Sequence, residues 1–213
     1  LRQLVPGEHD QIQAAWSPDG RQIAFLERPV QRIVLRDGES RNYEDIFVVN
    51  ANGSDLRQIT NDNGRVGLPT WSPDGNQLAY LQYEPGGWGM DDTALQIINK
   101  DGTCPRRLLD FNDLNIWTIA WSPYDSRLAL GARELSAAGR ADGRFGIYTL
   151  YADGTQLTRI TPNDEADYGR PAWQRTGVDP LVALETAVTQ SAQPDNAANL
   201  AAASSSDTTI PFK

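Results

Sequence analysis

Short apolar stretches separated by turn-forming residues recur along this chain, and each stretch opens a repeating unit. Three of them end at Trp16, Trp71 and Trp121, and a fourth ends at Trp173. A run of branched and aromatic residues follows each of the first three tryptophans, as is typical of half-buried strands. The pattern therefore predicts paired strands, at 12–16 with 22–26, at 67–71 with 77–82, and at 117–121 with 127–130.

A second pair of strands completes each unit. The segment Ile46–Thr60 aligns without gaps on Ile147–Thr161, and Leu95–Leu109 fits the same frame. Their centres carry Asn-Gly or Asp-Gly, the dipeptides that best accommodate a type I′ turn. We therefore expect a type I′ hairpin between the third and fourth strands of each unit, with Cys104 just after one of these turns.

The connection between the first two strands is also a tight turn. Ser-Pro-Asp-Gly occupies 17–20 and 72–75, where proline presets one dihedral angle and glycine supplies a positive one. The third unit departs from this pattern with Tyr124-Asp125. Because the tryptophans are spaced by 55, 50 and 52 residues, each unit matches one four-stranded antiparallel blade of an all-β propeller.

The combined motif resembles a known repeat. Trp-Ser-Pro-Asp-Gly followed by Ile-Ala-Phe, and then the Asn-Gly or Asp-Gly hairpin ending in Ile-Thr, is similar to the WD40-like (PD40) repeat of the TolB-type β-propellers. The resemblance implies a non-catalytic bacterial protein that binds or scaffolds other proteins and lies outside the cytoplasm, in the periplasm or secreted. The same repeat also resembles the propellers of prolyl-oligopeptidase relatives and tricorn-like proteases, so it specifies fold better than activity.

The repeat frame divides the chain into two parts. Residues 1–176 contain full blades at 12–60, 67–110 and 117–161, a last strand of a preceding blade at 1–5, and a first strand of an incomplete blade at 169–174. Residues 177–213 are expected to form a short helix near 180–190 and a polar tail. We favour a chain that is the C-terminal part of a longer six- to eight-bladed protein. Two copies completing one ring, or a reduced fourth blade, remain open alternatives.

Composition removes several function classes. A net charge of -9 argues against nucleic acid as a partner, and no apolar run approaches the length of a membrane span. One cysteine excludes an internal disulfide and a multi-cysteine metal site, and one histidine excludes a histidine-cluster site. No Gly-x-Ser-x-Gly elbow is present, and His9 is expected to be a surface residue. We expect no cofactor, although loop carboxylates without calcium-loop spacing leave a cation site open.

The irregular connections are the candidate recognition surface. The tight turns fall at one end of each blade, while the long mid-blade and inter-blade connections fall at the other. These connections carry the residue types enriched at protein interfaces. The candidate partner-binding residues are Arg28, Arg32, Arg36, Arg41, Tyr43, Tyr83, Trp88, Met90, Arg133, Arg140 and Arg144. Trp88 is the strongest single candidate. We expect protein partners, with self-association, a place in a larger assembly, or an accessory role beside a hydrolase domain as alternatives.

Overall fold

The computed structural model describes residues 3–28, 33–34, 40–41, 43–61, 65–83, 93–111, 113–135, 144–162 and 168–173. These residues belong to one compact unit that ends at Trp173. The helix expected near 180–190 and the polar tail lie outside the described residues.

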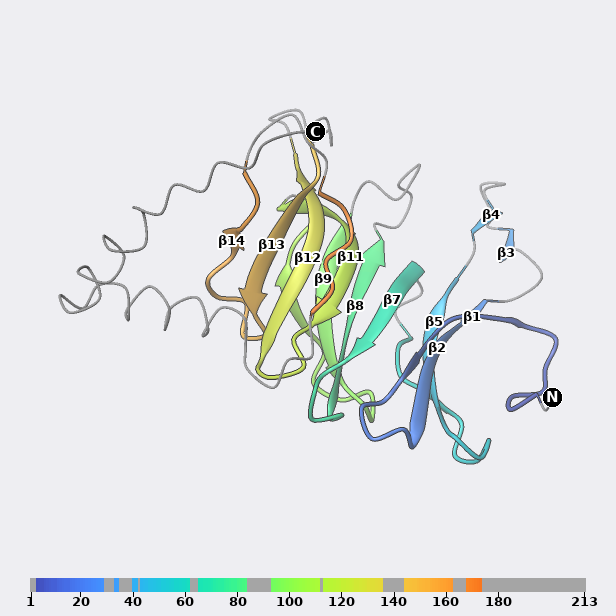
Figure 1. Cartoon of the computed structure of the whole chain (residues 1–213). Coiled ribbons are helices and arrows are strands. Elements are labelled where there is room, and N and C mark those ends of the chain that lie inside the picture. The colour runs from blue at the N-terminus through green and yellow to red at the C-terminus, as the bar shows by residue number, and fades with distance from the viewer. Residues whose placement is uncertain are drawn as a thin grey trace, which may run out of the picture. The chain divides into compact units, whose positions relative to one another are not determined.

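Three four-stranded antiparallel sheets follow one another along the chain, and Figure 1 shows them side by side. Sheet one contains β1 (Asp10–Trp16), β2 (Gln22–Arg28), β5 (Asp45–Asn50) and β6 (Arg57–Gln58). Sheet two contains β7 (Arg65–Trp71), β8 (Gln77–Tyr83), β9 (Thr93–Asn99) and β10 (Arg106–Leu109). Sheet three contains β11 (Leu114–Trp121), β12 (Arg127–Glu134), β13 (Gly146–Tyr151) and β14 (Thr158–Arg159). A small hairpin of β3 (Ile33–Val34) and β4 (Ser40–Arg41) separates β2 from β5 in sequence.

The predicted all-β architecture of four-stranded antiparallel blades is confirmed. In every sheet the strands are ordered as they occur in the chain. The first strands begin earlier than the sequence pattern predicted, at residues 10, 65 and 114 instead of 12, 67 and 117. These additional residues pair with the ends of the second strands, where Asp10 pairs with Arg28 and Asn115 with Arg133.

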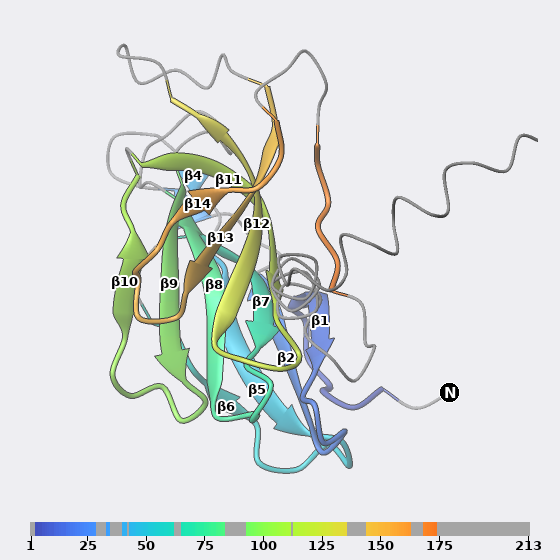
Figure 2. The ribbon, with the colours of Figure 1, turned by 60° about the vertical axis from the view of Figure 1, so that its left-hand side comes forward.

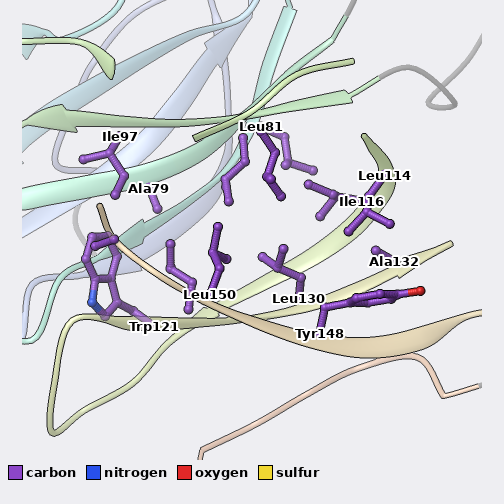
Figure 3. Packing of buried hydrophobic residues seen from close by; sticks show 14 of the residues in the cluster. Ala79, Leu81, Ile97, Leu114, Ile116, Trp121, Leu130, Ala132, Tyr148 and Leu150 are labelled. Carbon is purple, nitrogen blue, oxygen red and sulfur yellow. The ribbon is translucent and has the colours of Figure 1, made fainter. Parts of the chain in front are cut away.

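Two hydrophobic cores lie between consecutive sheets. Leu26 and Val48 of sheet one share the first core with Tyr80 of sheet two. The second core, shown in Figure 3, joins Leu81 and Ile97 of sheet two to Leu130 of sheet three. Sheet two is therefore covered on both faces, which explains why β9 is buried at every position except the last. Burying one such leucine side chain contributes about 1.5–3 kcal/mol.

The repeated tryptophan also joins neighbouring units. The indole Nε1 of Trp71 donates a hydrogen bond of 3.0 Å to the carbonyl oxygen of Ala15, the residue before Trp16. Trp173 repeats this contact at 3.0 Å on Ala120, the residue before Trp121. Trp16, which has no such acceptor in the described residues, is 58% exposed. Trp121 packs in the core between sheets two and three, but its buried Nε1 has no hydrogen-bond partner among the described residues. Trp71 and Trp173 thus join their units to the preceding unit through a hydrogen bond, and Trp121 does so through packing.

The tight hairpin turns differ from the predicted type I′ geometry, so that prediction is wrong. Gly53 donates its N–H to the carbonyl of Asn50 and has a φ of 90°, but the other left-handed residue is Asp55, not Asn52. A type I′ turn needs positive φ at two successive residues. Here the side chain of Asn52 accepts the N–H of Ser54 at 2.9 Å and forms an Asx turn instead. The Asp-Gly turns of the other two sheets show the same pattern, with Cys104 exposed and left-handed.

Hydrogen bonds within the Ser-Pro-Asp-Gly turns favour the charged form of their aspartates. The Ser72 hydroxyl donates to Asp74 at 2.6 Å, and this bond is the main cause that lowers the pKa of Asp74 below its ordinary value of 3.8. A carboxyl group whose pKa is lower in the folded state than in the unfolded state stabilises the fold. This stabilisation is complete at pH values above the unfolded-state pKa and is lost as the pH falls through the folded-state pKa.

We therefore expect Ser72→Ala to lower the free energy of unfolding at pH 7 and to flatten its fall below pH 3.8. Urea denaturation followed by circular dichroism between pH 7 and pH 2 measures both effects. Ser126→Ala is the control, because Ser126 is an exposed turn residue. A deficit for Ser72→Ala that stays constant across this pH range would contradict the role given to Asp74.

Candidate functional site

The two ends of the sheets differ in character. Figures 1 and 2 show the tight turns at the lower end and the β3–β4 hairpin at the opposite end. We call this opposite end the loop end; there β2, β8 and β12 finish at Arg28, Tyr83 and Glu134. The loop end is the end where the sequence placed the candidate residues.

Each sheet ends there in a row of three residues from neighbouring strands. In sheet one, Asp10 pairs with Arg28, and the register of β2 with β5 places Glu44 on the other side of Arg28. The equivalent rows are Arg65, Tyr83 and Thr93 in sheet two, and Asn115, Arg133 and Phe145 in sheet three. Arg28, Tyr83 and Arg133 therefore occupy the same scaffold position in three successive sheets.

The arginine of the sheet-one row is paired with two acids of its own row. Nη2 of Arg28 lies 3.0 Å from the Asp10 carboxylate, and Nη1 lies 3.7 Å from Glu44. Glu44 is only 6% exposed, and its second oxygen lies 3.6 Å from Nε of Arg65 in the next row. A buried carboxylate needs such partners, because removing a charge from water costs several kcal/mol. Arg28 is thus held by acids and linked to sheet two.

The residues of the sheet-two row pack against one another and against sheet three. The Arg65 guanidinium lies 5.0 Å from the centre of the Tyr83 ring. A Cβ at Gly67 would come within 2.9 Å of the Tyr83 hydroxyl, so glycine leaves room for the phenol. Burial is the main cause that raises the pKa of Tyr83, and the phenol is therefore protonated at neutral pH. Thr93 is fully buried and accepts the N–H of Ile116 at 2.8 Å, which ties this row to sheet three.

The row of sheet three combines a cation with two aromatic rings. The Arg133 guanidinium lies 4.4 Å from the centre of the Phe145 ring and 5.5 Å from that of Trp117. The two rings meet edge to face at 5.4 Å. Trp117 is 41% exposed, and its indole N–H donates to the side-chain oxygen of the fully buried Asn115. This arrangement holds Trp117 in place at the surface.

The other predicted residues are placed only in part. Tyr43 is half-buried beside Glu44, Arg144 is exposed beside Phe145, and Arg41 ends β4. Arg32, Arg36, Trp88, Met90 and Arg140 lie outside the described residues.

Sequence reasoning missed Trp117 and Phe145. Trp117 was predicted to begin a scaffold strand, whereas a β-bulge at this position places it beside Arg133. The gapless repeat frame was the signal for Phe145, because the offset that aligns Ile46 with Ile147 also aligns Glu44 with Phe145.

The described residues contain neither a metal-binding cluster of side chains nor a membrane-spanning helix. No group of three or more His, Cys, Asp or Glu side chains could hold a metal ion in this part of the chain. None of the described segments is a helix long and apolar enough to cross a membrane.

Three four-stranded sheets that share hydrophobic cores and are joined through a repeated tryptophan define blades of a β-propeller. No protein-family model matches the chain. Over 86 residues, which are 40% of this chain and 12% of the relative, it is 29% identical to "Uncharacterized peptidase YuxL" of Bacillus subtilis (strain 168).

Solved structures share the fold. A putative TolB from Agrobacterium tumefaciens matches 71% of this chain and 49% of its own length, with a TM-score of 0.52 and 19% identity. A puromycin-hydrolyzing peptidase from Mycobacterium tuberculosis matches 80% of this chain and 26% of its own length, with a TM-score of 0.58 and 19% identity. The chain thus spans less than half the length of these proteins, and at this identity the likeness concerns the fold.

Proposed function

We propose that this chain is a non-catalytic, protein-binding or scaffolding β-propeller whose loop end is the recognition surface. The observation that carries the proposal is the single scaffold position occupied by Arg28, Tyr83 and Arg133. Two of these three residues are arginines, but their neighbours in the row differ in every sheet, while the strands around them repeat. Variation on a repeated scaffold is how such folds present binding residues.

The tight-turn end suits this role poorly, because the carboxylates of its Ser-Pro-Asp-Gly turns are already used within those turns. Asp19 accepts the Ser17 hydroxyl at 2.7 Å and the Arg21 N–H at 3.0 Å. A hollow of about 300 Å³ lies between the turns of sheets one and two and is lined by turn residues that include Asp19, Asp74 and Lys100. Its aspartates hold their turns closed.

The proposal extends to the remaining candidates and to the organisation of the chain. We assign Arg32, Arg36, Arg41, Tyr43, Trp88, Met90, Arg140 and Arg144 to the same surface. We also assign residues 1–5 to the last strand of a preceding blade. In support, Val5 packs with Phe25 and Val49 of sheet one, as Ile59 packs with Tyr80 and Ile98 of sheet two. A location outside the cytoplasm belongs to the same proposal.

The similarity to the Bacillus peptidase favours a second candidate. The chain would then be part of the propeller of a hydrolase, and the loop end would face substrates on their way to a catalytic domain. A nucleophile-elbow sequence in the same gene would distinguish this candidate from an independent binding protein.

A paired set of surface variants tests the first proposal. Trp88→Ala combined with Arg36→Ala is expected to abolish capture of partner proteins from extracts of cells that make this protein. The matched variant at the tight-turn end, Arg21→Ala combined with Leu157→Ala, removes exposed side chains and should leave capture unchanged. Thermal unfolding should be nearly the same for both. Equal loss of capture in the two variants would overturn the assignment of the loop end.

A further inference from the structure

Arg133 differs from the other strand arginines in having no counter-ion among the residues that the structure describes. Each other arginine on the strands of the three sheets has an acidic partner within 4.0 Å or, like Arg106, donates to a carbonyl oxygen. Within the described part of the chain, Arg133 has neither, and its Nε is buried without a hydrogen-bond partner. A half-buried guanidinium that is left uncompensated is costly to the folded protein.

The equivalent residue in sheet one shows what is missing. Arg28 lies between the carboxylates of Asp10 and Glu44. At the two corresponding positions of sheet three stand Asn115, an uncharged amide, and Phe145, an apolar ring. Sheet three therefore keeps the arginine of this row but has no acid at either of the two flanking positions.

The nearest acid in sequence does not replace them. Glu134 accepts the Tyr148 hydroxyl at 3.0 Å and lies 3.4 Å from Nη1 of Arg159. Tyr148 belongs to the core between sheets two and three, so these contacts occupy the face of β12 opposite to Arg133. Glu134 therefore contacts Tyr148 and Arg159 and does not pair with Arg133.

The surroundings of Arg133 are suited to an anionic group of defined shape. Two aromatic rings hold the guanidinium, so its planar N–H groups lose little further freedom when they bind an oxygen pair. Guanidinium groups bind carboxylates in a bidentate manner, with charge-assisted bonds about twice as strong as neutral ones. The exposed face of Trp117 adds an apolar surface beside the charge.

We propose that Arg133, Trp117 and Phe145 form a binding site for a carboxylate on a peptide segment of a protein partner, with an apolar residue next to that carboxylate. The inference rests on the proposed function, since it supplies the partner chemistry of one part of the loop end. The chain carries a net charge of -9, so recognition depends on short-range contacts at this site and not on long-range attraction.

Binding of short peptides to the folded chain tests the site. The indole N–H resonance of Trp117 in ¹⁵N-labelled protein reports binding. The probes are acetyl-Gly-Phe-Asp-Gly-amide, the same peptide with Asn for Asp, and acetyl-Gly-Gly-Phe with a free or an amidated C-terminus. We expect saturable shifts with the Asp peptide or with the free C-terminus, and the stronger of the two identifies the source of the carboxylate. Equal binding of the charged and amide forms would overturn the proposal.

Three substitutions sharpen the test. Arg133→Met should abolish the shifts, while Arg107→Met should preserve them, because Arg107 stacks on Phe111 but already pairs with Asp110 at 2.8 Å. Asn115→Asp restores the acid that Arg28 has in sheet one and should weaken peptide binding at least tenfold by occupying Arg133. This last variant keeps the acceptor for Trp117 and decides the question if Arg133→Met fails to fold. Undiminished binding by Asn115→Asp would contradict the site.

The outcome also separates this inference from the function on which it rests. If partner capture depends on the loop end but survives Arg133→Met, the carboxylate site is wrong and the binding face stands. If the peptides bind at Trp117 but loop-end variants leave partner capture intact, the site exists and the proposed function is wrong.

Discussion

Replacing Trp71 with alanine is expected to lower the free energy of unfolding by about 3–5 kcal/mol, the usual cost of truncating a buried aromatic side chain. Trp71 is 6% exposed and lies in the core between sheets one and two. The substitution also removes the indole hydrogen bond to Ala15 of the preceding unit and leaves a cavity between two sheets. Urea denaturation followed by far-ultraviolet circular dichroism measures the loss without relying on tryptophan emission.

Trp16 supplies a matched control within the same phrase. It precedes an identical Ser-Pro-Asp-Gly turn but is 58% exposed. Trp16→Ala should therefore change the free energy of unfolding by less than about 1 kcal/mol. Similar losses at the two positions would show that the tryptophan stabilises its own turn and not the contact between sheets.

Substituting Gly131 with alanine is the second change for which we expect a large effect. A Cβ at this position of β12 would lie 2.0 Å from the carbonyl oxygen of Gly169 and 2.5 Å from the Thr118 hydroxyl. The segment 168–173 must then move away from sheet three, or β11 must shift. Overpacking of this kind costs about 1–3 kcal/mol.

Hydrogen exchange measured by mass spectrometry localises that effect. Gly131→Ala should accelerate exchange at Tyr168, whose N–H bonds to the carbonyl of Phe145, and should expose Trp173. Gly169→Ala is the control, because a Cβ there meets nothing within 4 Å. Unchanged protection of 168–173 in Gly131→Ala would mean that this segment does not pack on β12 as described.

The repeat frame predicted most of the fold because propeller blades are built from local patterns. Strand order and the two tight turns of each unit depend on residues close in sequence, and the structure has them where the pattern placed them. The turn type was wrong because the Asx hydrogen bond of Asn52 competes with the backbone preference of Asn-Gly. The turn preference of a dipeptide does not include hydrogen bonds made by its side chains.

The candidate site could be predicted only in outline. Arg28, Tyr83 and Arg133 were recognised by residue type and were placed in the mid-blade connections, whereas the structure has them at the ends of β2, β8 and β12. The contact of Glu44 with Arg65 joins two sheets. It depends on how neighbouring sheets pack, which the sequence pattern within one repeat does not determine. Trp117 was missed because the bulge beside Ile116 breaks the simple alternation of faces along β11.

Site-specific photo-crosslinking tests the central claim most directly, namely that recognition occurs at the loop end of the sheets. Trp117 and Tyr124 are exposed aromatic residues near opposite ends of sheet three. Each is replaced in turn by p-benzoylphenylalanine, and the protein is irradiated in the cells that make it. The account predicts discrete protein adducts from position 117 and none from position 124. Adducts from position 124 alone would contradict it.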